Sequence, residues 1–174
     1  MPLTVEDGSG RSDADAYVSV ADCDEYCASM GRKEWIVIDP GDPGDEENLL
    51  ARERAIRQGT AYLDARYAGR WRGNKRTAAQ ALSWPRVGAY DPDGYLISGL
   101  DKWVVSAACE AAYRYFTGAD MMPDVDRGGQ VISESVGSIS VTYASGAPAG
   151  TTFSVIDALL YPCIHGKTVW AVRA

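Results

Sequence analysis

The feature that most constrains the fold is a change in the spacing of apolar residues near residue 130. Before it, apolar side chains recur every three or four positions, as a helix requires, most clearly over residues 98–117. After it, Ile132 and Val136, and then Ile139 and Val141, alternate with serine and threonine, and Gly137 separates the two runs. A spacing of two is typical of strands. The sequence therefore predicts helices up to about residue 117, followed by a β-hairpin over residues 130–143.

Three segments have the helical spacing. The first begins after Ser19, a suitable N-cap, and ends at Gly31. In the second, Leu49, Ile56 and Leu63 recur every seven residues. The third has an alanine-rich centre that permits close approach of another helix. The predicted long helices cover residues 20–30, 46–67 and 98–117, and shorter ones cover residues 78–82 and 153–161.

These segments predict a mainly α protein. We expect a helical bundle of three long helices, joined by the β-hairpin and by a short C-terminal helix that Pro162 ends. Residues 1–161 would form the main domain. Residues 162–174 are apolar near their end and would form an extended C-terminal arm that either packs into the core or binds a partner protein.

Residues 80–96, QALSWPRVGAYDPDGYL, connect the second and third predicted long helices. We expect Trp84 to pack in the core and Pro85 to end the short helix before it. The turn at residues 91–94 would reverse the chain. Arg86 would pair with an acid of its own or a neighbouring subunit. The stretch therefore predicts architecture more than a binding site.

Charge is distributed unevenly over a chain whose net charge is −7. Residues 1–48 hold thirteen acidic and three basic residues, whereas residues 49–76 hold eight basic and two acidic ones. Such a chain could stack on copies of itself or contact nucleic acid, or the charges could simply be solvated helix faces. The candidates for a contact between subunits are Arg52, Arg57, Arg66, Arg70 and Arg72, with Asp22, Asp24 and Glu25.

A basic loop over residues 68–76 is the candidate nucleic-acid site. Arg70-Trp71-Arg72 places an aromatic ring between two guanidinium groups, and single strands are held by stacking combined with phosphate contacts. Alternatively, Trp71 packs on the bundle and the arginines pair with acids of an adjacent subunit. The net acidity of the chain favours this alternative. The candidate residues are Tyr67, Arg70, Trp71, Arg72, Lys75 and Arg76.

Catalytic and metal-binding patterns are scarce in the sequence. It contains neither a phosphate-binding loop nor a dinucleotide-binding glycine motif, and its single histidine makes a poor partner for Cys163. We therefore expect no enzyme and no cofactor. The four cysteines should be free buried thiols, although Cys23, Cys27, Cys163 and His165 could form a zinc site.

Neither a membrane span nor a secretory signal is expected. No run of eighteen apolar residues exists, and the first residues lack the basic and apolar regions of a signal peptide. This favours a protein that is used in a cytoplasm-like compartment.

Four stretches together resemble a family of tailed-phage proteins. They are LTVEDGSGRSDADAYVSVADCDEYCASMG, YLDARY, QALSWPRVGAYDPDGYLI and GGQVISESVGSISVTYASGAPAGTTFSVIDALLYP. The resemblance covers nearly the whole chain and is weakest at residues 35–47 and after Pro162. Members carry the description DnaT-like single-stranded-DNA-binding proteins and are encoded among head and head–tail joining proteins. Their architecture is similar to that of the helical head–tail connector, or adaptor, proteins that form a ring under the portal.

The resemblance implies a structural virion protein at the head–tail junction, present in the host cytoplasm during assembly. It would form a ring of copies, a dodecamer, that joins the phage portal protein to the tail or a stopper (tail-completion) protein and lets DNA pass through its bore. The acidic N-terminal third of one subunit would meet the basic band of the next. The arm would dock on the portal through Val169, Trp170 and Val172. The alternative is a DnaT-like replication protein that binds single-stranded DNA through the basic loop.

Overall fold

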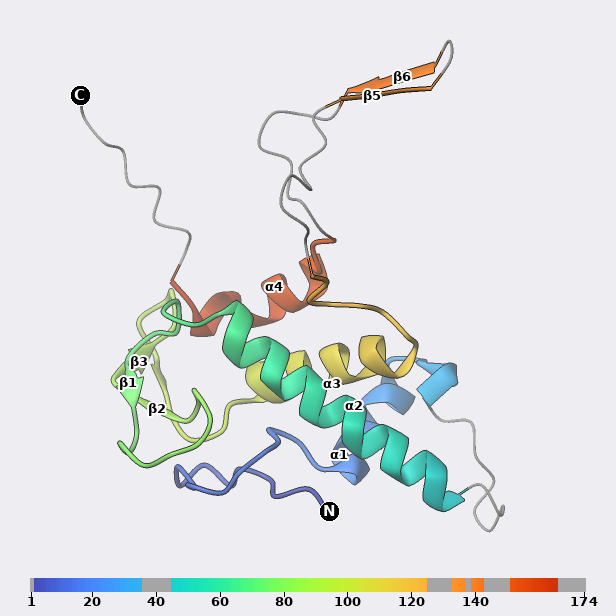
Figure 1. Cartoon of the computed structure of the whole chain (residues 1–174). Helices are drawn as coiled ribbons and strands as arrows, with labels where there is room; N and C mark the ends of the chain where they lie inside the picture. The colour runs from blue at the N-terminus through green and yellow to red at the C-terminus, as the bar shows by residue number, and fades with distance from the viewer. Residues whose placement is uncertain (1, 36–44, 125–132, 137–138, 143–150, 166–174) are drawn as a thin grey trace, which may run out of the picture.

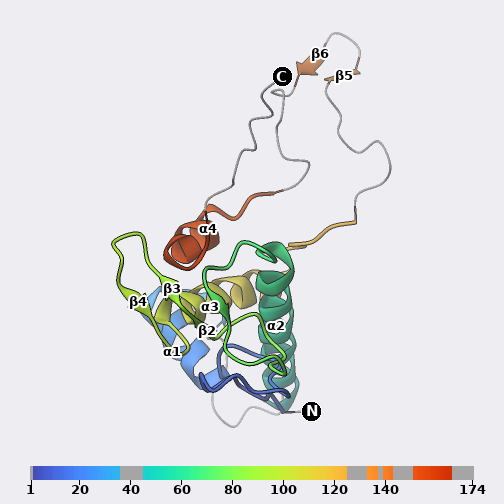
Figure 2. The same cartoon turned by 90° about the vertical axis from the view of Figure 1, so that its left-hand side faces the viewer.

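The computed structural model describes residues 2–35, 45–124, 133–136, 139–142 and 151–165. Its centre is a pair of helices, α2 and α3, against which the other helices pack. Figures 1 and 2 show α4 on one side of this pair and α1 on the other. The helices are α1 (Val20–Ser29), α2 (Asp45–Arg66), α3 (Lys102–Phe116) and α4 (Ser154–Leu160), with 3-10 turns η1 (Lys33–Trp35) and η2 (Tyr161–Cys163).

A glycine allows α2 and α3 to approach closely. A β-carbon added at Gly59 of α2 would lie 2.7 Å from the backbone nitrogen of Ala112 and 3.2 Å from the carbonyl oxygen of Ala108, both on α3. Real β-carbons do not come so near to backbone atoms, so the contact requires glycine. The small side chains of residues 107, 108, 111 and 112 on α3 are fully buried. The predicted close approach of the alanine-rich segment is confirmed.

The remaining elements complete the core around this pair. Trp35 of η1 packs on Phe116 of α3, with ring centroids 5.0 Å apart. Ile156 and Leu160 of α4 are fully buried. The N-terminal segment contributes Tyr17, which is also fully buried. Burying these large apolar side chains is the main favourable contribution to folding.

Short antiparallel strands make up the rest of the described structure. Three two-stranded sheets pair β1 with β2, β3 with β4, and β5 with β6. Gly73, which precedes β1, has a positive φ of 67°, and a β-carbon there would lie 2.4 Å from the carbonyl oxygen of Val87. The strands are β1 (Asn74–Lys75), β2 (Arg86–Val87), β3 (Ala89–Tyr90), β4 (Leu96–Ile97), β5 (Ser133–Val136) and β6 (Ile139–Thr142).

The predicted bundle of three long helices is wrong. Helices form in the three predicted segments, but α3 begins only at Lys102 and the chain before it forms the short strands β1 to β4, so the described fold is mixed and modest in helix content. The predicted helix at 78–82 does not form. There the Gln80 side chain accepts a hydrogen bond from the Thr77 N–H and donates to the carbonyls of Leu82 and Pro85. Side-chain bonds of this kind compete with a helical backbone.

The predicted β-hairpin at 130–143 is confirmed where it is described. Its strands β5 and β6 pair antiparallel, with Glu134 opposite Val141 and Val136 opposite Ile139. Figure 1 draws this hairpin apart from the helices. The arm residues Val169, Trp170 and Val172 lie outside the described residues. Within the described parts of the chain, no helix has the length and apolar character to span a membrane.

Candidate nucleic-acid interface

The two aromatic residues of the predicted nucleic-acid loop are in the core. Tyr67 is 1% exposed and Trp71 is 5% exposed. Trp71 lies between Tyr67 and Trp84, with ring centroids 5.9 and 5.8 Å away. The Tyr67 hydroxyl donates to Asp157 of α4 at 2.8 Å, and burial together with this carboxylate raises the pKa of Tyr67. Neither ring can stack on a base without unfolding this part of the core.

The two arginines that flank Trp71 tie the loop to the C-terminal segment. Arg72 donates from Nε to the carbonyl oxygen of Ile164 at 3.0 Å, and its backbone N–H donates to Cys163 at 2.9 Å. The carbonyl of Arg70 accepts from the backbone N–H of His165 at 2.7 Å. Trp71 and Ile164 form an antiparallel bridge between these contacts. The Arg72 guanidinium therefore serves architecture, whereas the Arg70 guanidinium lies over the Tyr67 ring, 5.3 Å from its centroid, and its buried Nε has no hydrogen-bond partner among the described residues.

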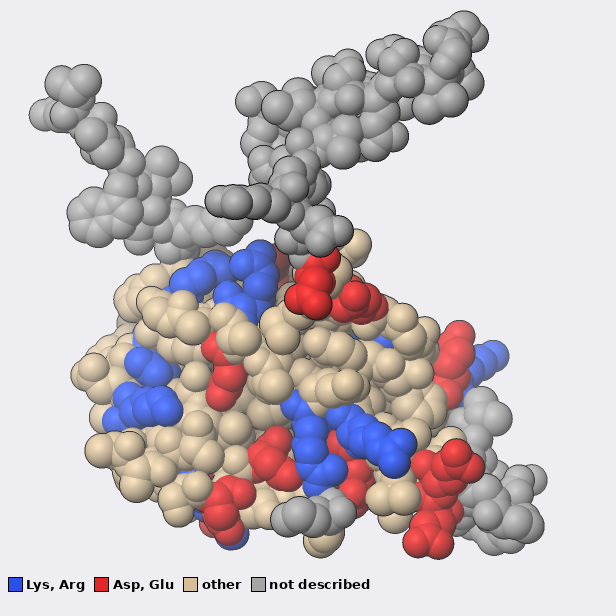
Figure 3. Space-filling view, viewed as in Figure 1, with Lys and Arg blue, Asp and Glu red and all other residues tan. Residues whose placement is uncertain are grey.

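Lys75 and Arg76 are the two exposed members of the predicted set. Lys75 lies in β1 opposite Arg86 of β2. The Arg76 backbone N–H donates to the carbonyl of Pro85 at 3.2 Å, which fixes the position from which its side chain leaves. In Figure 3, basic side chains gather where α2 ends and where β1 and β2 lie.

Exposed aromatic residues lie instead on the hairpin formed by β3 and β4. Tyr90 is 52% exposed and Tyr95 is 74% exposed. In the hairpin register Tyr90 is opposite Leu96, and Ala89 is opposite Ile97. Successive residues of a strand point to opposite faces, so the buried pair Ala89 and Ile97 turns Tyr90 and Leu96 outward.

The sequence predicted architecture for this stretch, and the hairpin was not proposed as a candidate site. Two tyrosines that flank a turn at residues 91–94 were the available signal, since residues beside a tight turn tend to be at the surface. The prediction that Trp84 packs in the core is confirmed, because Trp84 is fully buried. Tyr90 and Tyr95, which follow it in the sequence, are exposed instead.

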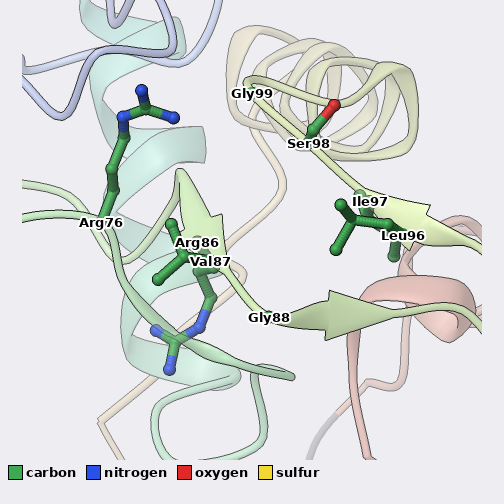
Figure 4. Close-up of a pocket in the computed structure, with 8 residues that line it drawn as sticks. All are labelled: Arg76, Arg86, Val87, Gly88, Leu96, Ile97, Ser98 and Gly99. Atoms are coloured by element: carbon green, nitrogen blue, oxygen red, sulfur yellow. The ribbon is translucent and has the colours of Figure 1, made fainter.

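A pocket of about 220 Å³ connects the exposed cation Arg76 with the β3–β4 hairpin. Figure 4 shows Arg76 on one side of this pocket and Leu96 on the other. Gly88 and the Ser98–Gly99 backbone lie between them in this view. The lining residues are Arg76, Arg86, Val87, Gly88, Leu96, Ile97, Ser98 and Gly99.

Arg86 is a structural residue at the edge of this pocket. Its guanidinium donates to the carbonyls of Arg72 at 2.7 Å, Gly73 at 2.6 Å and Ser83 at 3.1 Å. Burial lowers its pKa, but a guanidinium remains charged at neutral pH. Within the described chain Arg86 therefore bonds to three carbonyls and not to an acid, and these bonds hold β1 and β2 together.

Some of the residues predicted to make charge contacts between subunits form pairs within the chain instead. Arg52 donates twice to the Asp24 carboxylate, at 2.9 Å, and so connects α2 to α1. Arg57 pairs with Asp15 of the N-terminal segment at 2.7 Å. The Asp22 carboxylate accepts from the Ser19 hydroxyl at the start of α1. Glu25 and Arg66 are exposed.

The predicted zinc ligands do not come together. Cys23 and Cys27 are buried, and contact with Cys109 of α3 and with Cys27 raises the pKa of the Cys23 thiol. Cys163 is buried elsewhere in the core, and burial raises its pKa to about 12, whereas His165 is exposed. Among the described residues, no three histidine, cysteine or acidic side chains form a group that could hold a metal ion.

A scan against sequence models of protein families matches residues 1–174, the whole chain, to one family. That family is described as "Putative DnaT-like ssDNA binding protein". The chain belongs to this family. No curated protein and no solved structure shows a significant match.

Proposed function

We propose that this protein binds single-stranded DNA through the surface formed by Lys75, Arg76, Tyr90 and Tyr95, which we call the tyrosine–cation surface. One observation carries the proposal: two tyrosines that are more than half exposed lie on a hairpin whose pocket also contains an exposed arginine. Family membership supports the same ligand.

The chemistry of this surface suits a single strand. A base can stack on an exposed aromatic ring, which contributes about 1–3 kcal/mol per base. Lys75 and Arg76 would contact the phosphates. Asp91 and Asp93 lie in the turn of the hairpin, and Asp91 accepts from the backbone N–H groups of Asp93 and Tyr95. These carboxylates repel phosphates, so the backbone of the strand would follow the β1 side of the surface.

The overall charge of −7 sets the strength of this binding. Long-range repulsion opposes the approach of DNA, and only the local cations and the stacking favour it. We therefore expect modest affinity that is measurable at low ionic strength. With two phosphate contacts, a plot of the logarithm of the binding constant against the logarithm of the salt concentration should have a slope of about −1.4.

The test is fluorescence anisotropy with a labelled oligothymidylate at low salt. The double variant Tyr90→Ala/Tyr95→Ala should bind at least about tenfold more weakly, because two stacking interactions are lost. The control is Met30→Ala, because Met30 is 51% exposed and caps the end of α1, which packs on α2 and α3. Absence of binding by the wild-type protein, or an equal loss in the control, would refute the proposal.

A ring-forming head–tail adaptor is the second candidate. The observation that favours it is the run of exposed apolar side chains on β2, β3 and β4, which includes Val87, Tyr90 and Leu96, because such surfaces are typical of protein contacts. Copies of the chain would then assemble around a bore and dock on a portal. The intrachain pairs of Arg52 and Arg57 leave less of the basic band for that contact.

The two candidates predict different behaviour in the absence of DNA. An adaptor should form rings, visible by electron microscopy and by light scattering, and Tyr90→Ala/Tyr95→Ala should dissociate them. Mixing with portal should give a complex. A DNA-binding protein should bind oligonucleotides without any such assembly, so the same variant separates the candidates.

A further inference from the structure

The pocket between β2 and β4 has features that point to a particular part of the DNA. We infer that it accepts one nucleobase of a bound single strand, beside the tyrosines on which other bases stack. This inference rests on the proposed function and deepens it. It concerns Val87, Gly88, Leu96, Ser98 and Gly99, none of which the stacking proposal requires.

The size of the pocket limits what it can hold. Its volume is about 220 Å³. Pockets for drug-sized molecules begin at about 300 Å³, so this one suits a smaller group, such as a single base. It opens to the surface, because Arg76, Val87, Leu96 and Ser98 are all exposed. A base that is still attached to its strand could therefore enter it.

The lining of the pocket is mostly apolar at its opening. Val87 and Leu96 supply exposed aliphatic side chains, and buried Ile97 lies beneath. Gly88 and Gly99 have positive φ angles of 65° and 68°, and a β-carbon added at either position would meet no atom within 4 Å. Two glycines leave the backbone bare, which allows a planar ring to lie directly against it.

Two polar side chains at the rim of the pocket could bind the phosphate and the base edge of a nucleotide. Within the described part of the chain, neither the Ser98 hydroxyl nor the Arg76 guanidinium makes a hydrogen bond, and both line the pocket. Arg76 can bind the phosphate that follows the base, and Ser98 can donate to or accept from an edge of the base. By contrast, the Gly99 carbonyl already accepts from Trp84 Nε1 at 2.7 Å, so it is not available for this recognition.

The experiment compares two labelled strands of equal length at low salt. One is an oligothymidylate, and the other has the same phosphates and sugars but lacks all bases. The blocking variant is Ser98→Trp, which puts an indole in the pocket and leaves Tyr90, Tyr95, Lys75 and Arg76 unchanged. Ser154→Trp, at the exposed first residue of α4, is the matched control. Val87→Trp is a second blocking variant, because tryptophan suits an exposed strand position.

Blocking should weaken binding of the oligothymidylate about three- to tenfold and leave binding of the abasic strand unchanged. The Ser154→Trp variant should match wild type with both strands. If Ser98→Trp unfolds, as thermal denaturation would reveal, Val87→Trp provides the same comparison. Equal affinities of both blocking variants and wild type for the oligothymidylate would overturn the pocket inference while leaving the proposed function intact. Failure of the wild-type protein to bind the oligothymidylate would overturn both the pocket inference and the proposed function.

Discussion

The loop at residues 67–72 and the β3–β4 hairpin contain similar side chains in opposite environments. Both offer aromatic rings close in sequence to arginines. Tyr67 and Trp71 are buried, whereas Tyr90 and Tyr95 are exposed. The difference arises from partners far along the chain: Asp157 holds Tyr67, and residues 163–165 pair with the loop. An aromatic residue beside an arginine therefore indicates a binding site only when nothing distant in the sequence covers it.

The largest expected effect is on stability, at Trp71. Trp71→Ala removes a nearly buried indole from between two other rings and should lower the free energy of unfolding by about 3–5 kcal/mol. Tyr95→Ala should change it by less than about 0.5 kcal/mol, because Tyr95 is mostly solvated. Urea denaturation followed by circular dichroism measures both. Similar losses in the free energy of unfolding at the two positions would contradict the difference between the buried loop and the exposed hairpin.

The two arginines of the pocket should differ in the same way. Arg86→Ala leaves three carbonyl acceptors without their donor and should cost about 2–3 kcal/mol of stability. Arg76→Ala should leave the unfolding midpoint nearly unchanged. Thermal denaturation of the pair distinguishes the structural cation from the surface cation. A destabilised Arg76→Ala variant would show that Arg76 belongs to the architecture as well.

Acid should weaken the helical core by protonating Glu110. Burial acts to raise the pKa of Glu110, but hydrogen bonds from Arg32 and Arg114 to its carboxylate outweigh it and hold the pKa below its ordinary value of 4.5. An acid with a lowered pKa stabilises the fold at higher pH, and this contribution disappears as the pH falls through its folded value. The stability advantage of wild type over Glu110→Gln should therefore be largest near neutral pH.

Denaturation of these two proteins across the acidic range checks that sign. The difference between them should shrink as the pH falls below about 4.5, the ordinary pKa that applies to the unfolded chain, and should disappear once the folded carboxylate is also protonated. An advantage that grows on acidification would mean that the buried carboxylate is held in its neutral form instead.

The smallest expected effect is on the salt dependence of DNA binding. Arg76→Ala removes one phosphate contact. In a plot of the logarithm of the binding constant against the logarithm of the salt concentration, the slope should therefore become less negative by about 0.7. Arg54→Ala, at an exposed arginine within α2, is the matched control and should leave the slope unchanged. Equal changes in the two variants would mean that only net charge matters.

Local patterns in the sequence predicted much of the helical core. The alternation at residues 132–141 predicted the β5–β6 hairpin, because strand spacing is visible within a few positions. The small residues at 107–112 predicted that another helix approaches closely, but not that this helix is α2, which contacts them through Gly59. The two-residue strands β1 to β4 are too short to show any periodicity. Their pairing depends on Gly73, on the carbonyl contacts of Arg86 and on the turn at 91–94, which no apolar spacing reveals.

The candidate site was harder to predict than the core, for the same reason. Lys75 and Arg76 belonged to the predicted set and are exposed. Tyr67 and Trp71 belonged to it as well, but their burial depends on α4 and on residues 163–165, about ninety positions away. Tyr90 became a candidate only once the hairpin register placed it outward beside Leu96.

Ultraviolet cross-linking of the wild-type protein to an oligothymidylate, with mass spectrometry of the linked peptides, would show which aromatic residues contact the bases. We expect cross-links at Tyr90 and Tyr95, which are exposed on the β3–β4 hairpin. Cross-links at Tyr67 or Trp71, or at aromatic residues elsewhere with none on the hairpin, would contradict this expectation.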